Sequence, residues 1–122
     1  MSNPEKLVIM ATHGPEEPEL ATIPFVMGAA ALASDVDAVI GFQADAVLLV
    51  RKGEADRVQA PEFPPLCDLI DAYRELGGKL LVCAPSLNGR HITGDDLVEG
   101  AEIVAAGRFV AEITSSTNTL VY

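Results

Sequence analysis

Short apolar runs that alternate with helix-forming segments are the feature that most constrains the fold of this chain. The runs, each short enough to be one buried strand, occupy residues 6–13, 36–43, 79–84, 101–107 and 118–122. Strands that alternate with helices form βαβ units, in which right-handed crossovers join parallel strands. The alternation therefore predicts an α/β fold, a three-layer domain with a mostly parallel five-stranded sheet and helices on both faces.

Helix signals fill the intervals between these runs. A helix over 64–78 is the clearest, because proline opens it and two glycines end it. A second helix is predicted over 23–33, capped by Thr22 and buried on most sides, since its residues are apolar nearly all round. The segment 44–50 either continues the preceding strand or forms a short helix, and we favour the helix. Further short helices are expected over 93–100 and 108–116.

Length and composition indicate a single domain spanning residues 1–122. Hydrophobic residues make up 49% of the chain and charged residues 21%, which is sufficient for a packed core. The mean hydropathy of +0.29 is high for so small a chain. A sheet covered on both faces and apolar subunit interfaces would both account for this value, so we expect a homo-oligomer.

The charge balance excludes several classes of partner. A formal net charge of −10 argues against nucleic acid and against an anionic membrane surface, both of which attract basic proteins. The most apolar segment, 23–33, is too short to span a bilayer, and the N-terminus lacks the basic start of a signal peptide. We therefore expect a cytoplasmic protein whose two cysteines remain thiols. No G-x-G-x-x-G motif or P-loop is present, and no cofactor is expected.

The stretch KLLVCAPSLNGRHI, residues 79–92, carries the strongest chemical signal. Its apolar run ends at Cys83, and the candidate binding or thiolate-stabilising residues Ser86, Arg90 and His91 follow. His13 and Gly14 occupy the same position after the first strand. Ligands of open α/β sheets bind outside the carboxyl ends of the strands, and in the flavodoxin-like strand order 2-1-3-4-5 the first and third strands are neighbours. On that order, His13 and Cys83 would share one crevice.

A reactive cysteine must be deprotonated, and the pKa of a free thiol is about 8.5. Backbone amides after Cys83, the Ser86 hydroxyl and the Arg90 guanidinium could lower it; the alternative is an inert, buried cysteine. Ser86 stands where a C-x-x-C pair would have its second thiol, which disfavours disulfide exchange and favours a lone thiol that carries sulfur or forms a mixed disulfide. The two histidines and Cys83 do not have the spacing of a metal site, so no metal is expected.

Two stretches resemble the DsrE/DsrF-like sulfur-relay family: ATHGPEEPELATIPFVMGAAALASD and GGKLLVCAPSLNGRHITGDDLVEGAEIV. The resemblance implies a small flavodoxin-like α/β domain that assembles as a trimer or hexamer. Several members of the family carry a cysteine after the third strand that accepts and transfers sulfane sulfur, and Cys83 matches that position. Ser86 departs from the members that have a second cysteine there, whereas Arg90 and Ile92 fit the loop loosely.

These observations favour a sulfur carrier that holds sulfane sulfur as a persulfide on Cys83 and exchanges it with a donor or acceptor protein. Whether it is an enzyme of the sulfurtransferase type stays open. The alternative is a non-catalytic oligomeric binding or assembly module in which Cys83 is structural. A third possibility is a small-ligand pocket in a crevice between His13 and Cys83.

Overall fold

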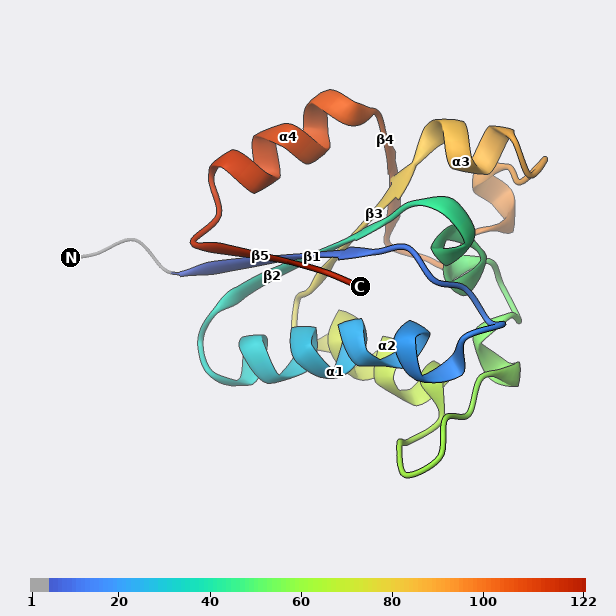
Figure 1. The fold of residues 1–122 in the computed structure, drawn as a ribbon, viewed down its shortest axis with the longest axis horizontal. Helices are drawn as coiled ribbons and strands as arrows, with labels where there is room; N and C mark the ends of the chain where they lie inside the picture. The colour runs from blue at the N-terminus through green and yellow to red at the C-terminus, as the bar shows by residue number, and fades with distance from the viewer. Residues whose placement is uncertain (1–4) are drawn as a thin grey trace.

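The computed structural model describes residues 5–122 and contains one five-stranded sheet in which every pair of neighbouring strands is parallel (Figure 1). The strands are β1 (Lys6–Ala11), β2 (Asp37–Phe42), β3 (Lys79–Cys83), β4 (Ala101–Val104) and β5 (Asn118–Val121). The helices are α1 (Pro18–Ala33), α2 (Leu66–Glu75), α3 (Ala84–Asn88) and α4 (Ala106–Thr114), with 3-10 helices η1 (Ala44–Val50), η2 (Ala55–Arg57) and η3 (Gly94–Asp96). The predicted α/β fold is confirmed.

The strand order is β4-β3-β2-β1-β5, so the expected order 2-1-3-4-5 is wrong. The chain adds β2, β3 and β4 in turn on one side of β1, and α4 then leads back across the sheet to place β5 on the other side. Figure 1 shows α1 and α2 on one face of the sheet and α4 on the opposite face. This change of face follows from the reversal of direction, because every crossover must remain right-handed. As a result, β2 separates β1 from β3.

The larger core lies between the sheet and the pair α1 and α2. The Phe25 ring packs 5.7 Å from that of Phe42 and 6.0 Å from that of Tyr73. The buried Tyr73 hydroxyl shares its one proton between two carbonyl oxygens, that of Lys79 at 2.7 Å and that of Ala38 at 3.2 Å. These bonds satisfy the polar end of an aromatic side chain that otherwise fills the core.

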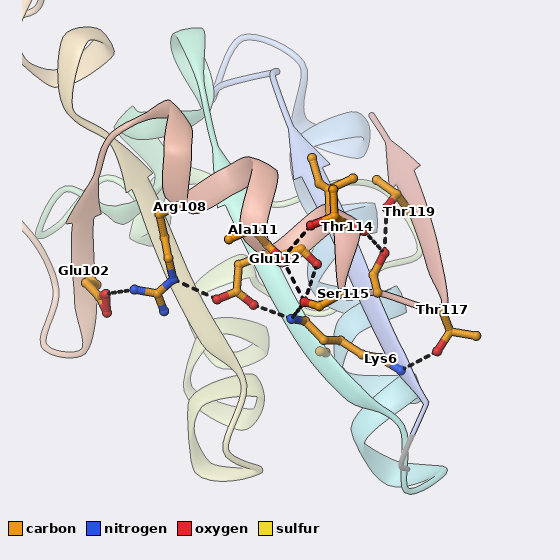
Figure 2. Close-up of polar contacts among 12 residues, drawn as sticks. Lys6, Glu102, Arg108, Ala111, Glu112, Thr114, Ser115, Thr117 and Thr119 are labelled. Atoms are coloured by element: carbon orange, nitrogen blue, oxygen red, sulfur yellow. Dashed lines mark hydrogen bonds and ion pairs between the residues drawn. The ribbon is translucent and has the colours of Figure 1, made fainter. Parts of the chain in front are cut away.

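The opposite face has a smaller core under α4, consisting of Val8, Met10, Val39, Leu81, Val104 and Phe109. Beside it, a chain of ion pairs joins α4 to the sheet (Figure 2). Glu112 faces inward from α4 and contacts Lys6 of β1 at 2.5 Å and Arg108 at 2.8 Å. Arg108 also binds Glu102 of β4 at 2.7 Å. Helix α4 is therefore attached to the sheet by the packing of Phe109 and by the ion pairs of Arg108 and Glu112.

Several boundaries differ from the sequence prediction. Helix α1 begins at Pro18, because the fixed φ of proline suits the first turn of a helix. Thr22, which was expected to cap the helix, lies inside it, and its hydroxyl donates to the Pro18 carbonyl at 2.7 Å. The outer side of α1, with Met27, Ala30 and Ala33, is exposed in the single chain, and the other residues of 23–33 are buried or half-buried. The segment 44–50 is a 3-10 helix, and residues 84–88 form a short helix where a loop was expected.

Candidate functional site

Cys83 is the last residue of β3 and lies at the carboxyl edge of the sheet. It is half-buried and packs against the smaller core, on the face that α4 covers. It pairs with Val104 of the edge strand β4, whose side chain belongs to the same core. Pro85 lies in the first turn of α3 and has no N–H to continue the sheet, so the strand ends at the cysteine. The structure therefore places this thiol between apolar packing and solvent.

Arg90 is bound to the carboxylate of Asp45. Its Nε and Nη2 donate to Asp45 Oδ1 at 3.2 and 2.8 Å, and its Nη1 donates to the Ser86 carbonyl at 3.1 Å. The Ser86 hydroxyl accepts the Ala44 N–H at 3.1 Å. Both predicted thiolate stabilisers thus bind the 3-10 helix η1, and within residues 5–122 no hydrogen bond reaches the Cys83 thiol.

The loop after β1 approaches the same 3-10 helix from the other side. A Cβ atom on Gly14 would lie 2.5 Å from the Asp45 carbonyl oxygen, so only glycine permits this contact. The Gly14 N–H donates to the Glu16 carboxylate at 3.2 Å, and His13 Nδ1 lies 3.4 Å from the Thr12 hydroxyl. Since η1 follows β2, it stands between the loops after β1 and β3. His13 and Cys83 therefore do not follow neighbouring strands, and that part of the expectation was wrong.

His91 lies in the turn after α3 with an exposed side chain. Its φ of +57° is left-handed, and its backbone N–H donates to the Asn88 carbonyl at 3.1 Å. The chain thus turns sharply at this residue before Ile92 returns to the core. Of the residues predicted for the site, Ser86 and Arg90 lie together with Asp45, His13 and Gly14 lie on the far side of η1, and His91 points into solvent.

Asp45 is the residue of this region that sequence reasoning missed. It lies in the first turn of η1, where an acidic side chain commonly stabilises a helix and so gives no functional signal by itself. Its partner Arg90 is 45 residues away, and only the pairing of β2 with β3 brings the two together. The available signal was an acidic residue just after one strand and a basic residue just after the next.

The remaining features of the surface lie away from Cys83. A hollow of about 570 Å³ lies near the start of β3 and β4, at the opposite edge of the sheet, lined by Asp71, Arg74, Glu75, Gly78, Leu80, Glu99 and Gly100. Across residues 5–122, no group of three or more His, Cys, Asp or Glu side chains is arranged to hold a metal ion. No helix in the same range is long and apolar enough to cross a membrane.

The chain is thus a small α/β protein with a five-stranded parallel sheet and one half-buried thiol at the carboxyl end of the inner strand β3. The chain belongs to the DsrE/DsrF-like family, whose sequence profile matches residues 5–122. It is 37% identical over 106 residues to the uncharacterized protein MJ0760 of Methanocaldococcus jannaschii, covering 87% of this chain but only 38% of that protein. It is 24% identical over 117 residues to MJ0989 of the same organism, covering 96% and 99%.

Two solved structures share the fold. The ychN protein from E. coli superimposes with a TM-score of 0.82 at 20% identity, covering 97% of this chain and 99% of that one. MTH1491 from Methanobacterium thermoautotrophicum, a protein of unknown function, gives 0.72 at 19% identity, with the same coverages. At these identities the likeness establishes the fold alone.

Proposed function

We propose that this protein is a single-thiol sulfur carrier, with Cys83 as the atom that accepts and donates sulfane sulfur. The observation that carries the proposal is the position of Cys83, half-buried at the strand end where the site of an open α/β sheet is found. Membership of a family of sulfur-relay type supports it. The partners would be a sulfur donor and a sulfur acceptor protein in the cytoplasm, where thiols stay reduced.

The proposed reaction is a pair of balanced displacements. The Cys83 thiolate attacks the outer sulfur of a donor persulfide, so that a new S–S bond forms on Cys83 and the donor leaves as a thiolate. An acceptor thiolate then attacks the outer sulfur of the Cys83 persulfide and releases Cys83 as a thiolate. No net oxidation or reduction occurs, and no cofactor is consumed.

The second cysteine is badly placed to resolve the persulfide as a disulfide. Cys67 lies on α2 and packs against the larger core, whereas Cys83 packs against the smaller core on the other side of the sheet. Partial burial and the neighbouring Asp68 raise the pKa of the Cys67 thiol, which makes it a poorer nucleophile at neutral pH. This arrangement favours transfer to a separate protein over an internal disulfide.

Replacing Cys83 by serine is expected to abolish sulfur loading. Protein incubated with inorganic polysulfide and analysed by intact mass spectrometry should gain one sulfur atom in the Cys67→Ser variant and none in Cys83→Ser. Cyanide should remove that sulfur as thiocyanate and restore the free thiol. Equal loading of the two variants would show that Cys83 has no special role.

An assembly role is favoured by a separate observation, the uncharged outer side of α4. Val110 and Ile113 are 58% and 36% exposed on that side, and the nearby edge strand β5 exposes 68% of Val121. Arg108 and Glu112 are engaged in ion pairs beside the sheet, so this surface does not carry their charges outward. We infer that it forms the contact between copies in a homo-oligomer, trimer or hexamer, because a chain with net charge −10 needs an uncharged surface to meet itself.

Val110→Asp is expected to convert the assembly to a smaller species, since it buries a carboxylate in an apolar contact. Light scattering coupled to size exclusion measures the mass directly. Leu76→Asp, at an apolar residue exposed at the end of α2, should leave the mass unchanged. A monomeric wild-type protein would refute the interface.

A further inference from the structure

We propose that Asp45, Arg90 and Ser86 form a clamp that positions the segment after Cys83, so that they act on the thiol through the backbone and not through their charges. The inference rests on the proposed function in taking Cys83 as the working thiol. These three are positioning residues, and the term clamp is used below for them together.

The first half of the clamp is the ion pair. Asp45 Oδ1 accepts two hydrogen bonds from Arg90, while the third nitrogen of the guanidinium, Nη1, donates to the Ser86 carbonyl inside α3. One planar side chain therefore binds both η1 and α3. Such multiply bonded arginines fix geometry more firmly than a single contact does.

The second half is the hydrogen bond from Ala44 to Ser86. Ala44 has a left-handed φ of +52°, a conformation that a non-glycine residue adopts only where its surroundings enforce it. Its N–H donates to the Ser86 hydroxyl at 3.1 Å. The next residue of α3, Leu87, is buried in the larger core. The Arg90 guanidinium and the Ala44 N–H thus bind Ser86, and the larger core holds Leu87. Both residues belong to α3, which begins immediately after Cys83.

The base of the clamp is itself supported. The Asp45 carbonyl oxygen packs closely against Gly14, so η1 lies between the loop after β1 and helix α3 and contacts both. A movement of α3 relative to the sheet would have to break the contacts of Arg90 and Ser86 with η1. The hydrogen-bonded Arg90–Asp45 pair is also electrically near neutral, which leaves little net charge to act on a thiolate.

A charge role and a positioning role predict different results for substitutions of Arg90 and Asp45. If Arg90 stabilised the thiolate by charge, Arg90→Gln would raise the pH at which Cys83 is half-ionised, and Asp45→Asn would lower it by freeing the arginine. If the clamp positions the segment, both changes release α3. Each should then accelerate labelling of the half-buried thiol in the same direction, and the double variant should do no more than either single one.

The experiment measures the rate of iodoacetamide labelling of Cys83 between pH 6 and pH 10 in a Cys67→Ser background. We expect labelling to be several-fold faster in Asp45→Asn, in Arg90→Gln and in the double variant. The increase over the wild-type rate should be the same in all three. The exchanged pair Asp45→Arg with Arg90→Asp should restore the wild-type rate. Ser86→Ala, a milder change that keeps the fold, should act in the same direction. Glu54→Gln removes the nearby Arg51–Glu54 ion pair and should change nothing.

Opposite shifts of the labelling pH for Asp45→Asn and Arg90→Gln, or additive effects in the double variant, would overturn the clamp. So would unchanged rates in all clamp variants. Thermal unfolding of each variant separates local release from loss of the fold. Sulfur loading of the wild type is scored independently: failure to load would reject the carrier function while the labelling pattern still decides the clamp.

Discussion

Gly41→Val is expected to lower the free energy of unfolding by about 2–3 kcal/mol, as overpacking of a filled core does. Gly41 lies on β2 under α4, and a Cβ there would stand 2.7 Å from the Phe109 ring and 2.8 Å from the Met10 sulfur. Met10 is flexible, but Phe109 is the aromatic side chain that fixes α4 to the sheet. A branched side chain at this position must therefore lift the helix.

The same substitution should also expose the thiol. Cys83 packs against the core that Phe109 covers, so its labelling should be faster when α4 is displaced. Urea unfolding and iodoacetamide labelling measure the two effects. Gly107→Ala is the matched control, because it adds a methyl group to α4 with no neighbour within 4 Å and improves helix propensity. Equal stability of Gly41→Val and the wild type would mean that α4 is not packed as described.

Glu112→Gln is expected to lower the free energy of unfolding by about 2 kcal/mol at neutral pH. Removing one member of a fully buried pair costs about 3–5 kcal/mol, and the cost is smaller here because Lys6 and Arg108 remain partly exposed to water. Glu102→Gln is the control, since that carboxylate contacts only Arg108 among the ion pairs of the network and is half-exposed. Its loss should cost at most about 1 kcal/mol.

The effect of Glu112 should depend on pH with a defined sign. Hydrogen bonding from Lys6, and then from Arg108, outweighs burial and holds the pKa of Glu112 below its ordinary value of 4.5. A carboxyl group with a depressed folded-state pKa stabilises the protein above about pH 4.5, and that contribution is lost as the pH falls through the folded pKa. The difference between wild type and Glu112→Gln should therefore shrink below pH 4.5 in urea titrations. A constant difference down to pH 3 would contradict the assignment.

The parts of the fold that sequence predicted are those written in local patterns. Each of the five strands was recognised from its own apolar run, and the helix over 64–78 from its proline and glycines. Strand order was not predictable in this way, because it depends on which apolar edges pair across long separations. The assumed neighbour relation between the first and third strands failed for this reason, and the argument for a crevice shared by His13 and Cys83 lost its basis.

In the candidate site, too, local sequence predicted some features, whereas others depend on contacts between distant segments. Cys83 could be placed at a strand end because the apolar run and Pro85 are adjacent to it in sequence. The surroundings of Arg90 could not, because its carboxylate partner comes from the loop of a different strand. Sequence showed that an arginine, a serine and a cysteine share one loop; the pairing of β2 with β3 determines that the first two turn toward Asp45.

The pairing of β5 with β1 has a consequence for how the protein is made. Leu7 lies opposite Asn118, so one edge of the first strand gains its partner only after more than a hundred further residues have been added. Until then a growing chain presents an unpaired apolar strand on the ribosome, the kind of edge that recruits other chains. Contacts of such high sequence separation also slow folding. Synthesis thus passes through a stage in which the edge of β1 that later pairs with β5 has no partner in the sheet.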